Sequence, residues 1–104
     1  MYSRKAQVYH SRLRMGCSSL NYHLFVNHCL EDSKCQFEAS CETPKHYFFE
    51  CALYERERSK LFDVFQGNNL TTEILLYGNN DWSNEENQFL FKHVQRYIDE
   101  TNRF

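Results

Sequence analysis

The sequence predicts a small, mainly α-helical domain with one irregular, cysteine-bearing loop. The 104 residues include only three glycines and one proline, which disfavours a turn-rich β fold. Hydrophobic residues make up 41% of the chain and aromatic residues 16%, enough to bury one core and too much for a disordered chain. We expect a single domain over 1–104, with a basic helical segment at 1–30, a zinc knuckle at 35–51 and a helical C-terminal part at 53–104.

The N-terminal segment predicts two helices. Residues 1–15 read as a continuous helix, and Gly16 follows at the place where a left-handed residue closes a helix at low cost. Ser18 or Ser19 is a suitable cap for a second helix over 20–29.

The middle of the chain predicts a loop followed by further helices. Residues 31–42 are polar and show no helical stripe, which favours a loop or a short β-hairpin. Thr43-Pro44 is a strong helix start and opens a stretch rich in helix formers over 45–65. A short helix through Tyr77 begins at Thr71 or Thr72.

The last predicted helix begins with a capping box. Ser83 and Glu86 have the Ser-x-x-Glu spacing of that motif. Apolar residues then recur at helical spacing on one side of the helix: Phe89, Leu90, Val94, Tyr97 and Ile98.

Four residues of the middle segment have the chemistry of a zinc site. Cys35, Cys41, His46 and Cys51 follow the pattern C-x5-C-x4-H-x4-C. Three thiolates and one imidazole are a tetrahedral zinc set, and four protein ligands make the ion structural. The five cysteines are an odd number and no secretory signal precedes them, so a disulfide framework is disfavoured.

Helical geometry constrains this set, and other ligands remain open. Five residues turn an α-helix by about 500°, so His46 and Cys51 would point about 140° apart on an unbroken helix. The zinc hypothesis therefore predicts a break around 51–54. A rival set replaces Cys35 with Cys29 or recruits His28, and without a metal the same residues are ordinary loop thiols and a surface histidine.

The charge is divided unevenly along the chain. Residues 1–30 carry a local charge of +4 and no acid, from Arg4, Lys5, Arg12 and Arg14, whereas 31–104 carry −6. With Tyr2 and Tyr9, these cations would suit a phosphate backbone with stacked bases; a solvated helix face is the alternative. No apolar run is long enough to cross a membrane, and we expect an intracellular protein, cytoplasmic or nuclear.

Two stretches resemble the C-terminal tail of non-LTR (LINE-type) retrotransposon reverse-transcriptase polyproteins. The first is the segment 11–21, which contains Arg-Leu-Arg-x-Gly; the second contains Glu42-Thr43, His46 and Cys51 in the order of the family's zinc knuckle. The ending, with Leu-Tyr-Gly at 76–78, is also similar. The chain departs from the family in the wide gap before Cys41, and Ala52 stands where proline often follows.

The resemblance implies a role with RNA or DNA and, as a partner, the remainder of the polyprotein. It implies Cys35, Cys41, His46 and Cys51 as ligands and places Arg12 and Arg14 in the family's basic segment. The chain lacks the paired aspartates of the polymerase and the endonuclease carboxylates, so we expect no enzyme activity from it alone. The alternatives are a helical protein-interaction module and a decayed fragment without activity.

Overall fold

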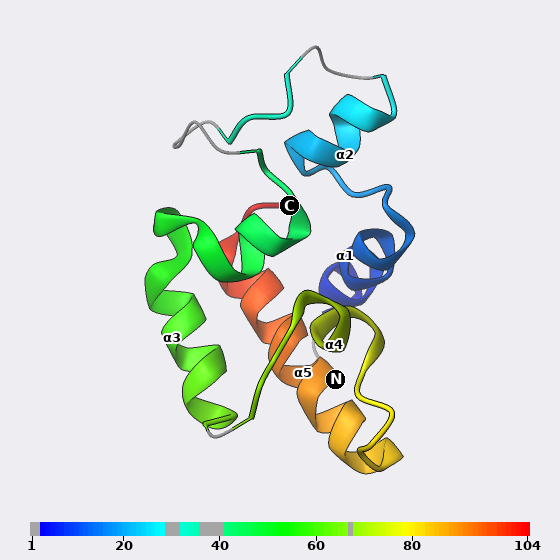
Figure 1. Cartoon of the computed structure of the whole chain (residues 1–104), viewed down its shortest axis with the longest axis vertical. Coiled ribbons are helices and arrows are strands. Elements are labelled where there is room, and N and C mark those ends of the chain that lie inside the picture. Colours follow the sequence, from blue (N-terminus) through cyan, green and yellow to red (C-terminus); the bar gives the residue numbers. More distant parts are fainter. Residues whose placement is uncertain (1–2, 29–31, 36–40, 67) are drawn as a thin grey trace.

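The computed structural model describes residues 3–28, 32–35, 41–66 and 68–104. The molecule measures 41 × 24 × 24 Å and is mainly helical, with no strand among the described residues (Figure 1). Its elements are α1 (Arg4–Met15), α2 (Asn21–Val26), the π-helix η1 (His46–Glu50), the 3-10 helix η2 (Ala52–Tyr54), α3 (Glu55–Val64), α4 (Thr72–Tyr77) and α5 (Asn84–Thr101). The predicted mainly α-helical fold is confirmed, whereas the zinc-knuckle loop stays a prediction.

Several helix ends lie where local signals predict them. Gly16 ends α1 with φ of 71°, in the left-handed region. The hydroxyl of Thr71 accepts a hydrogen bond from the Ile74 amide and caps α4. Ser83 forms both bonds of the predicted capping box at the start of α5. These ends depend on residues close in sequence, which is why the sequence predicts them well.

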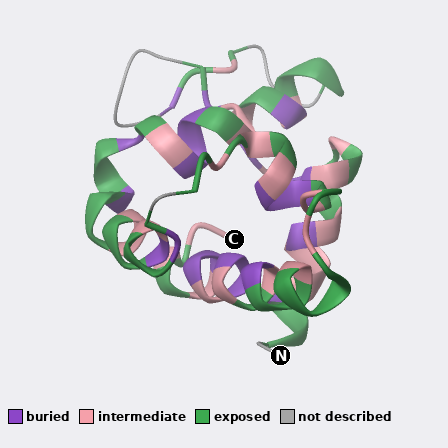
Figure 2. Cartoon of the chain, turned by 60° about the horizontal axis from the view of Figure 1, so that its bottom comes forward, coloured by how far each residue is buried: buried purple, intermediate pink, exposed green. Residues whose placement is uncertain are grey.

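The central element is α5, against which α1, α3 and α4 pack. Its buried stripe contains Leu90, Val94, Tyr97 and Ile98 (Figure 2). Phe89 does not belong to this stripe: it is 49% exposed, because it lies about 100° around the helix from Leu90. It contacts the rings of Phe65 and His93 at the edge of the core.

The second helix is shorter than expected and is capped differently. It begins at Asn21, and neither Ser18 nor Ser19 caps it. Instead the Ser18 hydroxyl is paired with the buried His23 ring at 2.7 Å, and the Asn21 amide donates to the Glu42 carboxylate at 2.7 Å. A carboxylate from a distant segment thus replaces the predicted local cap.

The helical stretch expected over 45–65 is broken, as the zinc hypothesis requires. It consists of η1, η2 and α3, and the backbone at Cys51 is extended between η1 and η2. Upstream, Lys34 and Cys41 form an isolated antiparallel bridge, consistent with a short hairpin, although 36–40 lie outside the described residues. Within the described part of the chain, no helix has the length and apolarity needed to span a membrane.

Candidate metal centre

A π-helical turn aligns His46 with Cys51. The Cys51 amide donates to the His46 carbonyl at 2.8 Å, a bond that spans five residues instead of the four of an α-helix. In such a turn the side chains of residues i and i+5 point to nearly the same side of the helix. In an α-helix they would point about 140° apart. The π-turn therefore directs both side chains to one side of η1.

Side chains at both ends hold this turn in place. At its start, the Thr43 hydroxyl accepts a hydrogen bond from the His46 amide at 3.1 Å. At its end, the Arg58 guanidinium donates to the carbonyls of Phe48, at 3.1 Å, and Cys51. These carbonyls lie where the helix breaks, so a charged donor from α3 supplies bonds that the regular ladder does not.

The structure brings together three of the four predicted ligands. The donor atoms of Cys35, His46 and Cys51 all lie within 4.8 Å of one another. The two sulfur atoms are 3.9 Å apart, and the exposed fractions of the three residues are 6%, 1% and 1% in the same order. Two buried sulfur donors and one buried nitrogen donor thus converge from two separate chain segments.

The imidazole of His46 has no hydrogen-bond partner among the described residues. Both ring nitrogens are buried and unpartnered, and the nearest carboxylate oxygen, on Glu50, is 3.7 Å from Nδ1. That distance is too long for a hydrogen bond. A buried polar group without a partner is costly, and a metal bond to one nitrogen would remove part of that cost.

The spacing of the donors fits a tetrahedral zinc ion. Two sulfurs about 2.3 Å from zinc at a tetrahedral angle lie about 3.8 Å apart, close to the 3.9 Å between Cys35 and Cys51. Thiolate and imidazole are also the donors that zinc prefers, whereas calcium and magnesium prefer oxygen. The three converging residues therefore fit three positions of the donor set that the sequence predicts.

The fourth predicted ligand, Cys41, lies outside this cluster. It is exposed, and its sulfur is 3.1 Å from the Ser33 hydroxyl. Because Cys41 is bridged to Lys34, its side chain points to the same face as that of Lys34, while the adjacent Cys35 points to the other. The rival ligand Cys29 lies outside the described residues.

His28, the other rival ligand, is exposed and is not part of the cluster. Its backbone has φ of 63°, in the left-handed region. The described part of the chain therefore supplies three converging donors and leaves the fourth position to be assigned.

The predicted nucleic-acid residues divide into two groups. Arg4, Lys5 and Arg12 are exposed on α1, whereas Arg14 is partly buried. The ring of Tyr9 is engaged within the protein, since it stacks on Phe104 at 4.7 Å and lies under the Arg12 guanidinium at 5.0 Å. Tyr9 is therefore a weak candidate for base stacking, and Tyr2 lies outside the described residues.

An ion pair that the sequence does not predict lies beside the cluster. The Arg103 guanidinium donates to both oxygens of the buried Glu42 carboxylate, at 2.9 and 2.6 Å, and to the Ser19 carbonyl at 3.0 Å. The hydrogen bond with Glu42 raises the pKa of Arg103. The pair joins the C-terminal tail to α2 and to the segment carrying Cys41, and no local pattern in the sequence indicates a contact across 61 residues.

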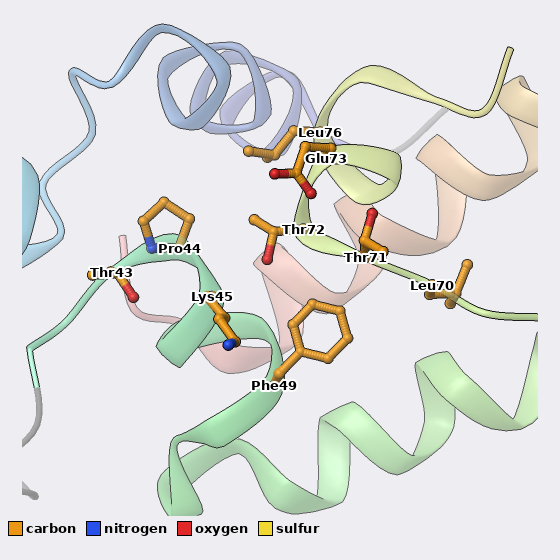
Figure 3. Close-up of a pocket in the computed structure, with 9 residues that line it drawn as sticks. All are labelled: Thr43, Pro44, Lys45, Phe49, Leu70, Thr71, Thr72, Glu73 and Leu76. Carbon is orange, nitrogen blue, oxygen red and sulfur yellow. The ribbon is translucent and has the colours of Figure 1, made fainter.

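A hollow of about 580 Å³ lies beside η1, between its start and α4 (Figure 3). Its walls combine apolar side chains, including Phe49 and Leu76, with the opposite charges of Lys45 and Glu73. None of the lining residues has an unpartnered buried polar atom. The hollow therefore indicates no particular ligand.

The fold and the cluster define a small helical protein with a buried Cys₂His donor set. Comparisons with protein-family models, with curated proteins and with solved structures find no match for this chain.

Proposed function

We propose that this chain is a non-catalytic, zinc-stabilised module that binds or positions RNA or DNA. The observation that carries the proposal is the convergence of Cys35, His46 and Cys51, all buried, with both imidazole nitrogens unpartnered. The ion would be structural, since a protein donor in the fourth position closes the site.

We assign the fourth position to Cys41. A one-residue change of register at the Lys34 bridge would turn the Cys41 side chain to the face that carries Cys35. Cys29 is the alternative, and an intact metal site in a Cys41→Ser variant would favour it.

A metal of this kind would supply much of the stability. A domain of this length has a net stability of about 5–15 kcal/mol, and structural zinc contributes apparent binding energies of about 10–16 kcal/mol. The cluster ties residue 35 to residues 46 and 51, so its loss would first loosen the middle of the chain.

The basic face of α1 supports the nucleic-acid part of the proposal. Arg4, Lys5 and Arg12 are exposed, and the first 30 residues contain no acid to neutralise them. Contacts of lysine and arginine with phosphates dominate nucleic-acid affinity. The resemblance to reverse-transcriptase tails suggests a partner, the remainder of such a polyprotein. The module would help that partner to hold its template.

A protein-interaction module is the second candidate, because two apolar side chains are exposed near the end of α3. Val64 is 41% exposed, and Phe89, which contacts the Phe65 ring, is 49% exposed. A monomer in sedimentation experiments that does not bind apolar dyes would count against this alternative.

The intact mass of the folded protein under native conditions tests the metal. We expect an increment of one zinc ion, lost in Cys51→Ser and His46→Gln and retained in Cys17→Ser, whose exposed thiol lies outside the cluster. Chelation should lower the melting temperature of the wild-type protein. A folded protein that takes up no zinc would overturn the proposal.

Binding of RNA and DNA oligonucleotides across a salt series tests the second part. We expect affinity to fall with salt, with a logarithmic slope of about −0.7 for each phosphate contacted on a single strand. Affinity that is undetectable or independent of salt would remove the nucleic-acid function.

A further inference from the structure

A pocket of about 490 Å³ lies between α1 and α5, away from the metal cluster. One wall is a single face of α1, and the other is a single face of α5, because the lining residues recur at helical spacing on both. The lining residues are Gln7, Ser11, Arg14, Gln88, Phe91, Lys92 and Gln95.

Among the described residues that line the pocket there are two cations and no acid. Arg14 and Lys92 both line it, and the Arg14 guanidinium lies 5.4 Å from the centre of the Phe91 ring. The Nε atom of Arg14 is buried without a hydrogen-bond partner among the described residues, and burial lowers the pKa of this side chain. A buried charged donor without an acceptor is costly, so the pocket favours an anion.

One residue that lines the pocket also has an unpartnered acceptor, which a ligand can reach only if the side chains that cover it move. Gln95 is only 6% exposed, and its Oε1 has no hydrogen-bond partner among the described residues. A chain of bonds fixes the orientation of the amide. His10 Nε2 must donate to the Leu75 carbonyl at 2.8 Å, so in the neutral ring Nδ1 accepts from Gln95 Nε2 at 3.3 Å.

A ligand that bonds both Arg14 Nε and Gln95 Oε1 must combine an anionic acceptor with a hydrogen-bond donor. A ribonucleotide unit has both, since its phosphate oxygens accept and its 2′-hydroxyl can donate. A deoxyribonucleotide keeps the phosphate but lacks the 2′-hydroxyl.

We infer that the pocket between α1 and α5 binds one ribonucleotide unit of an RNA strand. The phosphate accepts from Arg14 and Lys92, and the 2′-hydroxyl donates to Oε1 of Gln95. The inference rests on the proposed nucleic-acid function and adds to it a preference for RNA over DNA. It also adds two contacts on α5, Lys92 and Gln95, to the basic residues of α1.

Fluorescence anisotropy of the full chain in zinc-containing buffer tests the preference. The probes are a fluorescein-labelled oligouridylate, the matching deoxyuridine strand and the matching 2′-O-methyl strand. We expect the RNA strand to bind about 3- to 10-fold more tightly than the other two, the effect of one hydrogen bond. This comparison needs no change to the protein and therefore cannot fail through misfolding.

Variants assign the preference to the pocket. Gln95→Met removes the acceptor at similar size and should abolish the preference, so that the RNA strand binds no more tightly than the deoxyuridine strand. Lys92→Gln, an exposed position, should weaken all three strands several-fold and reduce the salt slope by about 0.7. Arg56→Gln, which removes an exposed charge of α3, is the matched control and should change nothing by more than about twofold.

The possible outcomes distinguish failure of the ribonucleotide pocket from failure of the proposed nucleic-acid function. Equal binding of the three strands, a preference that survives in Gln95→Met, or equal behaviour of Lys92→Gln and Arg56→Gln would overturn the pocket and leave the nucleic-acid function standing. No binding of any strand would overturn both.

Discussion

The buried histidine of α1 should make the protein less stable in acid. His10 is fully buried, and burial lowers its pKa from 6.5 to about 4. The neutral ring donates to the Leu75 carbonyl and accepts from Gln95, an arrangement that protonation of Nδ1 would break. The folded protein therefore binds this proton more weakly than the unfolded chain does.

The direction and size of the change in the free energy of unfolding follow from the difference in proton binding between the folded and unfolded states. Above about pH 7 the imidazole is neutral in both states and has no effect on stability. As the pH falls from 6.5 toward 4, the unfolded chain takes up the proton first, so the free energy of unfolding decreases. Each tenfold difference in proton affinity is about 1.4 kcal/mol, which makes the full loss from His10 about 3 kcal/mol, reached below about pH 4.

Urea unfolding of the wild type and of His10→Gln, followed by circular dichroism, measures this effect. Glutamine also offers one donor and one acceptor, so it is the closest uncharged replacement. Burial also lowers the pKa values of His23 and His93, but these contributions are common to both proteins. The difference between the two curves therefore reports His10 alone.

We expect the wild type to lose more stability than the variant between about pH 7 and pH 4, by about 3 kcal/mol. Parallel curves for the two proteins would refute the reasoning, because they would mean that His10 is protonated as readily in the fold as in the unfolded chain.

Three further predictions concern the supports of the site and one turn. Arg58→Gln should weaken zinc binding at least about tenfold, measured by competition with a chelator, with Arg56→Gln as control, because it frees the carbonyls that close η1. Glu42→Gln should destabilise the fold by about 3 kcal/mol in urea, and the added change Arg103→Gln should recover part of this loss; additive losses would contradict a buried pair. Gly78→Ala should cost about 1–2 kcal/mol in thermal unfolding, since φ is 88° and the new Cβ would lie 3.0 Å from Asn87 Oδ1; an unchanged melting temperature would contradict it.

The sequence predicts the helices whose ends are determined locally. Gly16, Thr71 and Ser83 act on backbone groups within a few residues, so their effect does not depend on the rest of the fold. The start of α2 could not be predicted in this way, because its partner, the Glu42 carboxylate, comes from a segment 21 residues away.

The candidate site was predictable in its chemistry more than in its geometry. The requirement that His46 and Cys51 face one ion predicts a break in the helix, and the structure has one. That the break takes the form of a π-turn depends on the Arg58 contact and on the packing of Tyr47 and Phe48 in the core. The direction of Cys41 depends on the register of a single bridge, which composition and spacing do not determine.

The π-turn makes the pairing of His46 with Cys51 tolerant of a one-residue deletion in the segment between them. A π-turn is equivalent to an α-helical turn that has gained one residue. Deleting one residue between His46 and Cys51 would restore four-residue spacing, at which an ordinary α-helix places the two side chains next to each other on one face. Shortening the segment would thus spare the ligand pair and misplace the neighbouring aromatic rings, so the extra residue serves the interior of the protein and the donors tolerate it.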